Sequence, residues 1–265
     1  MFPSPPGRSR HSRDPRAGAA ERQISWFYRL NPEFRKIHPI GARLPEECLI
    51  INSHSLRSFQ FQTSHYVPSY QLWLDASDLR ISYAEHRRFL QHLQWRNRAE
   101  RWVLKAPAHL YGLDAILSVY PDACVIFTHR NPLEVVASMA SLHAVLRSTF
   151  SDAVDPYAVG AEVTRRWAEG IDRALRVRDT GTVPPNRFFD VRYADLVRDP
   201  IEMVKSVYRH FEIDLTPAAE QRMGRYLAQN PKDKHGRHRY SLEQFGLEAS
   251  EESQRYRAYR ERFKL

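Results

Sequence analysis

The sequence predicts an α/β fold with parallel strands, and three features of residues 101–138 support this prediction. Residues 102–104 and 124–127 are short, nearly all-apolar runs with polar neighbours, as the strands of buried parallel sheets are. Between the two runs, apolar residues repeat at helical spacing, at Leu110, Leu113, Leu117 and Tyr120. Polar side chains follow both runs, where open α/β sheets bind their ligands. We therefore expect a strand–helix–strand unit with a right-handed crossover.

The region before this unit, residues 19–100, is expected to be helical and irregular. Apolar residues at helical spacing mark one helix near residues 24–30 and another over residues 83–95. Pro45 and Pro68 stand where first-turn prolines open two more helices. These patterns set the first part of the chain apart from the α/β part that follows.

The region after the unit returns to helix and strand patterns. Residues 157–178 have the apolar spacing of a long amphipathic helix, which Gly181 and the prolines after it bring to an end. Residues 187–191 predict a third strand. Asp199 and Pro200 then supply a cap and a first-turn proline for the next helix. Helical patterns dominate from there to the end of the chain.

The composition is that of a folded protein from a reducing compartment. The chain has 265 residues, which suits one domain or one domain with a subdomain, and 42% of them are hydrophobic. Its two cysteines, Cys48 and Cys124, lie far apart and form no metal-binding pair. No apolar run approaches the length of a membrane span, and no signal-peptide pattern opens the chain. We therefore expect a cytoplasmic protein that uses no metal.

Positive charge gathers in two segments, and the net charge of the chain is +9. Residues 1–18 mix prolines with arginines and are expected to form a disordered basic tail. Residues 232–239 form a second basic cluster, which contains Lys234, Arg237 and Arg239. A short loop this rich in cations either closes over a phosphate or is simply solvated.

Arg130 stands where a phosphate would bind. It follows the second predicted strand directly, and Asn131 and Pro132 supply an N-cap and a first-turn proline for the next helix. A helix N-terminus offers free N–H groups and the positive end of the dipole to an anion. Ser138 lies two turns further along, on the same face of that helix. Glu134 counts against this interpretation, because a carboxylate in the first turn competes with an incoming anion. The alternative is an exposed arginine beside a surface serine.

Taken in order, these segments resemble the bacterial sulfotransferases. The resemblance covers residues 20–260 and rests on several segments: Lys105-Ala-Pro-Ala-His109, Thr128-His-Arg-Asn-Pro132 with Ser138 beyond it, Arg192-Tyr-Ala-Asp-Leu196, residues 31–48, the basic loop and residues 240–247. It implies a three-layer α/β fold related to the P-loop kinases, with a mostly parallel sheet and many helices. It also implies that a sulfuryl group moves from 3′-phosphoadenosine 5′-phosphosulfate (PAPS) to a hydroxyl or amine of a small acceptor. Residues 19–265 would then form one domain, with residues 19–100 on the acceptor side and residues 101–265 binding the nucleotide.

The resemblance also assigns residues to the nucleotide. Arg130 and Ser138 would hold the 3′-phosphate, and Tyr193 matches the residue that lies near the adenine in such enzymes. The basic loop is similar to a segment that closes over the phosphates, which adds its three cations to the expected nucleotide site: Lys234, Arg237 and Arg239.

Two further residues match catalytic positions. Lys105 resembles the lysine that stabilises charge on the sulfuryl or leaving-group oxygen, and His109 is then the nearest candidate for the base that deprotonates the acceptor. Sulfuryl transfer depends mainly on positioning and charge stabilisation, and histidine is the natural base near neutral pH. His54 is a rival base, and His129 lies beside the expected phosphate turn.

One element of the family pattern is missing from the chain. Such enzymes open with a strand and a phosphate loop of the kind Gly-x-Pro-Arg-Ser-Gly-Thr-Thr, whose amides hold the 5′-phosphosulfate. No such loop occurs in this sequence, so we expect an N-terminally truncated fold with impaired activity. One alternative is a catalytically inactive remnant that acts by protein contacts. A basic nucleic-acid-binding protein ranks last, because the aromatic residues are spaced as core residues and are not interleaved with the cations.

Overall fold

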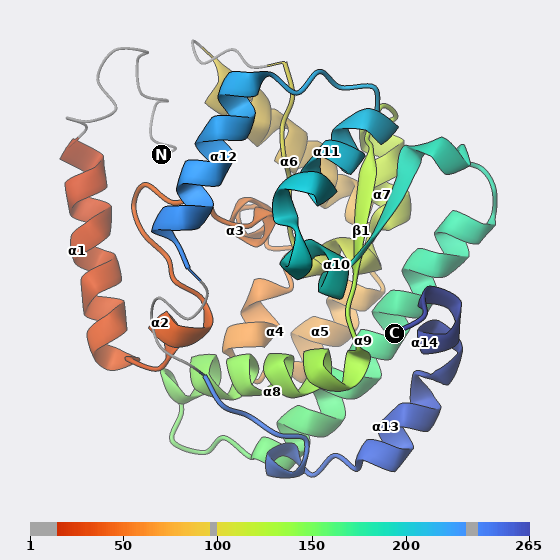
Figure 1. The fold of residues 1–265 in the computed structure, drawn as a ribbon. Helices are drawn as coiled ribbons and strands as arrows, with labels where there is room; N and C mark the ends of the chain where they lie inside the picture. Colours follow the sequence, from red (N-terminus) through yellow and green to blue (C-terminus); the bar gives the residue numbers. More distant parts are fainter. Residues whose placement is uncertain (1–14, 96–99, 232–237) are drawn as a thin grey trace. The chain divides into compact units, whose positions relative to one another are not determined.

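The chain folds into two compact units, each of which has its own set of helices. The computed structural model describes residues 15–95, 100–231 and 238–265. Unit 1 comprises the chain up to Pro121 together with Leu142–Val154, and unit 2 comprises Asp122–Ser141 and Asp155–Leu265. Figure 1 follows the elements from red at the N-terminus to blue at the C-terminus. The boundary expected between residues 100 and 101 therefore falls inside unit 1.

The regular secondary structure of unit 1 is helical within its described residues, as the sequence predicts for this region. In chain order its elements are α1 (Pro15–Leu30), α2 (Phe34–Ile37), α3 (Cys48–Ser53), α4 (Gln60–Ser64), α5 (Pro68–Asp75), α6 (Leu79–Gln94), the 3-10 helix η2 (Pro107–Tyr111) and α7 (Leu113–Val119). Pro68 opens α5 as predicted, and Asp78 caps α6 by accepting a hydrogen bond from the Arg80 amide at 2.9 Å. Residues 15–18 of the expected tail are helical in α1, and residues 1–14 lie outside the described residues.

The core of unit 1 joins α3, α5, α6 and α7. Its buried members are Cys48, Phe59, Leu74, Leu79, Tyr83, Ala106, Ala108 and Ala115. Gly112, between η2 and α7, is required at this place, because a Cβ there would lie 2.9 Å from the Tyr83 ring and 3.1 Å from Leu79. Because Gly112 has no side chain, α6 packs closely against the turn between η2 and α7.

The strand predicted over residues 102–104 is wrong. The structure has an extended segment there that pairs with no strand, and the described residues hold one sheet of two strands, both in unit 2. The side chain of Val103 is 95% exposed, although the pattern predicted a buried run. An apolar run indicates a strand only if a neighbouring strand completes its hydrogen bonds, and local sequence does not reveal that neighbour. The expected strand–helix–strand crossover is therefore absent from the described chain.

Unit 2 holds a parallel pair of strands, and both were predicted. β1 (Val125–His129) pairs with β2 (Phe188–Arg192) in a register that runs from Val125↔Phe188 to His129↔Arg192. Around the pair come α8 (Pro132–Ser148, which belongs to unit 2 up to Ser141), α9 (Pro156–Asp179), η3 (Pro185–Arg187), α10 (Tyr193–Arg198), α11 (Pro200–His210), α12 (Pro217–Gln229), η4 (Glu243–Phe245), α13 (Ala249–Arg255) and α14 (Arg257–Phe263). The protein is thus a helix-rich α/β structure with a small parallel sheet, which agrees with the predicted class.

Local sequence explains how the helices of unit 2 begin and pack. Asp155 and Asp199 cap α9 and α11 with their carboxylates, the second by accepting from the Glu202 amide at 3.0 Å. Gly160, in α9, is required for a close approach, because a Cβ there would lie 2.1 Å from the carbonyl oxygen of Phe245. The segment after residue 237 is therefore held tightly against α9.

Candidate active site

Two of the residues predicted to bind nucleotide meet at the carboxyl ends of the strands in unit 2. Arg130 follows β1 and Tyr193 follows β2, and the parallel register brings these two positions side by side. The Arg130 guanidinium lies over the Tyr193 ring, 4.6 Å from its centre. This cation–π contact fixes a cation and an aromatic face at one point beside the start of α8.

Glu134 occupies the Arg130 fork, as its place in the first turn suggested. Its Oε2 accepts from Arg130 Nη2 at 2.7 Å and from Nε at 2.9 Å. Burial alone would lower the pKa of Arg130, but Glu134 outweighs it and raises that pKa, with smaller contributions from Tyr240 and Tyr193. An anion that binds the fork must therefore displace or share it with this carboxylate. The capping arrangement is completed by Asn131, whose Oδ1 accepts from the Leu133 amide at 3.3 Å.

The end of the basic loop is attached to α8. Ser141 Oγ and His238 Nε2 form a hydrogen bond of 2.6 Å, and Ser138 lies one turn earlier on the same helix. Arg239, the next residue after His238, is exposed. The other two expected loop cations, Lys234 and Arg237, lie outside the described residues. The sequence analysis did not single out Ser141, although it lies one turn after Ser138 on the same helix, and it included His238 only as a member of the basic cluster.

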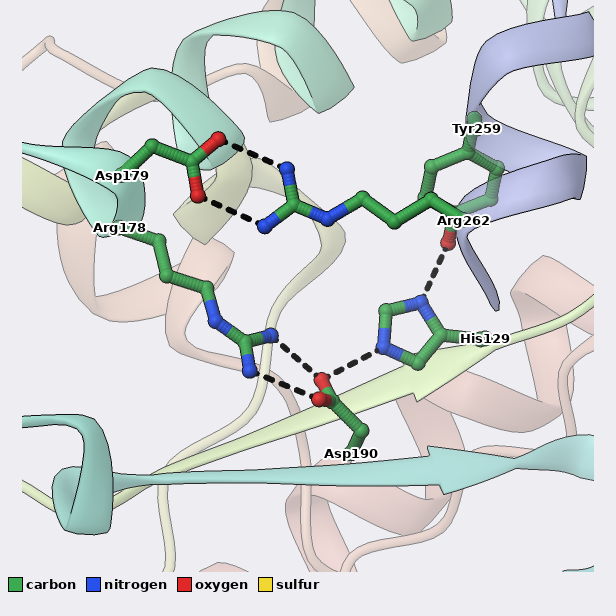
Figure 2. A network of polar contacts seen from close by, with 6 residues as sticks. All are labelled: His129, Arg178, Asp179, Asp190, Tyr259 and Arg262. Atoms are coloured by element: carbon green, nitrogen blue, oxygen red, sulfur yellow. Dashed lines mark hydrogen bonds and ion pairs between the residues drawn. The ribbon is translucent and has the colours of Figure 1, made fainter. Parts of the chain in front are cut away.

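A network of polar contacts holds the strand ends of unit 2 in place (Figure 2). His129, the last residue of β1, is fully buried, and its Nε2 lies 2.8 Å from Asp190 Oδ1 on β2. Its Nδ1 lies 2.7 Å from the Tyr259 hydroxyl on α14. Arg178, near the end of α9, binds Asp190 with both terminal nitrogens, at 2.6 and 2.7 Å. Two strands and two helices are thereby fixed beside the residue that precedes Arg130.

The charges of this network balance one another. Burial on its own would raise the pKa of the Asp190 carboxyl, but hydrogen bonds from His129 and Arg178 hold that pKa well below its usual range. The His129 ring also stacks on Phe263, with centres 3.7 Å apart. A second bidentate pair, between Arg262 and Asp179, is more exposed and lies next to the partly exposed pair of Arg178 and Asp190 (Figure 2). The network therefore has a structural role, and its members come from positions up to 130 residues apart.

In unit 1, Lys105 lies between the extended segment and η2. The prediction that it follows the end of a strand is therefore wrong. Its carbonyl accepts from the Cys48 amide at 2.9 Å, which ties the segment to the start of α3. The Lys105 ammonium forms an ion pair with Glu47, the N-cap residue of α3, and the lysine side chain stays largely exposed. A cation is thus held at a defined place four residues before His109.

His109 lies on η2, in a group of buried polar side chains. Its Nδ1 is 2.8 Å from the hydroxyl of Tyr83 on α6. Burial, with smaller contributions from His86 and Lys105, lowers the pKa of His109 to about 4. The ring is therefore neutral near pH 7 and has a lone pair with which it can accept a proton.

The rival base, His54, lies at the C-terminal end of α3. It is exposed and stacks on Phe89 of α6, with ring centres 5.2 Å apart. The structure thus gives the two histidines different surroundings, one exposed on an aromatic ring and the other bonded to a buried hydroxyl.

Comparison with known proteins decides the family. A sequence model of the sulfotransferase family matches residues 3–217. The chain belongs to the sulfotransferase family. It is 30% identical over 191 residues to the omega-hydroxy-beta-dihydromenaquinone-9 sulfotransferase Stf3 of Mycobacterium bovis, and to the protein of the same name from Mycobacterium tuberculosis. These matches cover 67% of this chain and 46% of each relative, so the chain spans about half the length of the curated relatives it matches.

Solved sulfotransferases share the fold. Sulfotransferase STF1 from Mycobacterium tuberculosis superposes with a TM-score of 0.83 at 32% identity, over 97% of this chain and 67% of that one. Sulfotransferase STF9 from Mycobacterium avium gives 0.81 at 26% identity, over 99% of this chain and 67% of that one. Among the residues described, no helix is long and apolar enough to span a membrane, and no three metal-ligand side chains cluster.

Proposed function

We propose that this sulfotransferase moves a sulfuryl group from PAPS to a hydroxyl or amine of a small acceptor. The observation that carries the proposal is the meeting of Arg130 and Tyr193 at the start of α8, where a phosphate and an adenine would find a cation and an aromatic ring. Family membership supports the reaction class.

Unit 2 would supply the nucleotide contacts. Arg130 and Ser138 would bind the 3′-phosphate, and Tyr193 would lie near the adenine. The basic loop would bring its cations to the phosphates, and the bond between His238 and Ser141 supports this, since it fixes the end of the loop on α8. Glu134 would leave the Arg130 fork as the phosphate enters.

Unit 1 would supply the chemistry at the acceptor. The acceptor oxygen or nitrogen forms a bond to sulfur, while the bond between sulfur and the bridging oxygen breaks and adenosine 3′,5′-bisphosphate leaves with that electron pair. Lys105 would stabilise the charge that develops on the bridging oxygen, and His109 would take the proton of the acceptor. His54 remains the alternative base.

Among the two acceptor groups, we favour a hydroxyl. The name of the Stf3 relatives describes a substrate that carries a hydroxyl group on a menaquinone derivative. Because this chain spans less than half the length of those relatives, the acceptor class is carried over only as a proposal.

The test is sulfuryl transfer from ³⁵S-labelled PAPS to a panel of acceptors, namely 4-nitrophenol, a long-chain primary alcohol and glucosamine. We expect a labelled product from at least one hydroxyl acceptor and its loss in Arg130→Ala. Arg165→Ala is the matched control, because Arg165 also pairs with a glutamate four residues on, in unit 2, at 2.8 Å. A folded chain that labels no acceptor and does not cleave PAPS would instead indicate a non-catalytic member of the family.

A further inference from the structure

A short segment late in the chain is fixed to two helices of unit 2. The segment is residues 238–247, which we call the strap, and it includes η4. At its first residue, His238 Nε2 and Ser141 Oγ on α8 form a hydrogen bond of 2.6 Å. The other end of the strap packs on α9. The strap therefore bridges α9 and the helix whose first turn lies beside Arg130.

Packing holds the α9 end of the strap. The Phe245 carbonyl oxygen lies so close to α9 that a Cβ on Gly160 would come within 2.1 Å of it. Phe245 and Leu247 are buried, and the amides of both donate to the Leu242 carbonyl, at 2.9 and 3.1 Å. These bonds keep this part of the strap in one compact turn. Because that end is tightly packed, the bond to Ser141 decides how closely the rest of the strap follows α8.

The strap meets α8 next to a residue of the proposed phosphate site. Ser141 comes three residues after Ser138, and residues three apart are neighbours on a helix surface, with about 5–6 Å between their Cβ atoms. Ser141 is buried, whereas Ser138 is half-buried. The strap thus contacts α8 one turn beyond the serine that would bind the phosphate.

Two side chains of the strap have the chemistry of an anion site. Arg239 and Tyr240 directly follow His238, and Arg239 is exposed. The rings of His238 and Tyr240 have their centres 5.6 Å apart, so the place of the histidine also influences that of the tyrosine. Burial lowers the pKa of Arg130, but Glu134 raises it, and Tyr240 adds a smaller contribution of the same sign, as a nearby group does. A guanidinium and a phenol O–H both donate hydrogen bonds to phosphate oxygens.

We propose that His238 is a positioning residue of the nucleotide site, which fastens the strap to Ser141 on α8. With the strap in place, Arg239 and Tyr240 donate hydrogen bonds to the 3′-phosphate at Arg130. His238 acts through these two neighbours and does not touch the nucleotide. The inference rests on the proposed function, because the 3′-phosphate belongs to the donor proposed there.

The direct test is calorimetric titration of the full chain with adenosine 3′,5′-bisphosphate. His238→Phe keeps a ring beside Tyr240 but removes the bond to Ser141. We expect the Kd of the bisphosphate to rise about fivefold, which corresponds to about 1 kcal/mol, the usual contribution of one hydrogen bond. Adenosine 5′-monophosphate, titrated at millimolar concentration, lacks the 3′-phosphate, and its affinity should not change. An equal loss for both nucleotides would overturn the inference.

Rescue separates the bond from general packing. His238→Gln places an amide where Nε2 stands, so it can still bond Ser141 and should keep most of the affinity for the bisphosphate. A purely structural role would leave His238→Gln and His238→Phe alike. That result would also overturn the inference.

The same bond can be removed from α8. Ser141→Ala should raise the Kd as much as His238→Phe does, and the double variant should be no worse than either, since both remove one interaction. Ser141→Ala also keeps the test open if His238→Phe does not fold. Ser148→Ala is the matched control, because Ser148 lies on the same helix but bonds the Val145 carbonyl at 2.9 Å. Additive losses in the double variant, or an equal loss in Ser148→Ala, would contradict the role of the bond.

Arg130→Ala separates this inference from the proposed function. Unchanged affinity for the bisphosphate in Arg130→Ala would remove the phosphate site itself from the start of α8. A loss in Arg130→Ala, beside wild-type affinity in both His238→Phe and Ser141→Ala, would overturn the role of the strap alone.

Discussion

The two units place histidine in opposite kinds of surroundings. In unit 1, His86 and His109 meet neutral tyrosine hydroxyls, and burial lowers the pKa of each to about 4. In unit 2, His129 is fully buried and meets the carboxylate of Asp190, which Arg178 also binds. The first arrangement keeps a neutral ring able to accept a proton, whereas the second locks a ring into a network of charges. The same residue type is thus held neutral beside a hydroxyl in one unit and anchors a strand in the other.

We expect the largest difference between the two arrangements in how acid changes the stability that their histidines contribute. An unfolded histidine titrates near pH 6.5 and these folded ones near 4, so the unfolded chain binds more protons between these values. Stability is therefore fully present above pH 6.5 and is lost as the pH falls towards 4. From pH 7 to pH 5 we expect a loss of about 2 kcal/mol from His86 and less from the partly exposed His109. The measurement is the urea midpoint at the two pH values.

Two comparisons sharpen this result. His86→Gln should have a smaller difference between its pH 7 and pH 5 midpoints than the wild type, because one titrating group is gone. Asp190 contributes in another window, since its depressed pKa gives stability that is present above about pH 4 and is lost only below it. A urea midpoint that is as high at pH 5 as at pH 7 would contradict the account of the histidines in unit 1.

The network in unit 2 should respond to removal of its carboxylate. Asp190→Ala leaves the buried Nε2 of His129 without its partner and frees Arg178, so we expect a loss of about 2 kcal/mol of unfolding free energy at pH 7. Partial exposure of Asp190 keeps the loss from being larger. Urea unfolding measures it.

The neighbouring ion pair in Figure 2 provides the control for that variant. Asp179→Ala removes a carboxylate with the same two-nitrogen contact from an arginine, Arg262, but at an exposed position. We expect it to cost about 0.5 kcal/mol. Equal losses of unfolding free energy in Asp190→Ala and Asp179→Ala would mean that the hydrogen bond between His129 and Asp190 adds nothing to stability.

Local sequence predicted those parts of the molecule that local interactions determine. The runs that became β1 and β2 are apolar over a few residues, and Asn131 with Pro132 marks the start of α8 without help from the rest of the chain. Arg130 was predicted from its place directly after a strand, whereas Tyr193 was predicted from the family resemblance. Their contact follows from the parallel register of β1 and β2, which the structure shows and the sequence did not predict.

Contacts between distant residues could not be predicted in this way. The segment 102–104 has the composition of a strand, but a strand also needs a neighbour. Tyr83 and His109 are 26 residues apart, and His129 and Asp190 are 61 apart, so nothing in either local pattern indicates that they meet. Asp190 was recognised only as part of a strand. Its role depends on Arg178, and nothing in the helix pattern distinguishes Arg178 from the other arginines on the surface.

The roles proposed for Arg130 and His109 are tested most directly by calorimetric titration with adenosine 3′,5′-bisphosphate. We predict micromolar binding by the wild-type chain, its loss by at least tenfold in Arg130→Ala, and unchanged binding in His109→Ala, since the first residue belongs to the proposed nucleotide site and the second to the proton chemistry. Wild-type affinity in Arg130→Ala, or affinity lost in His109→Ala, would contradict the account.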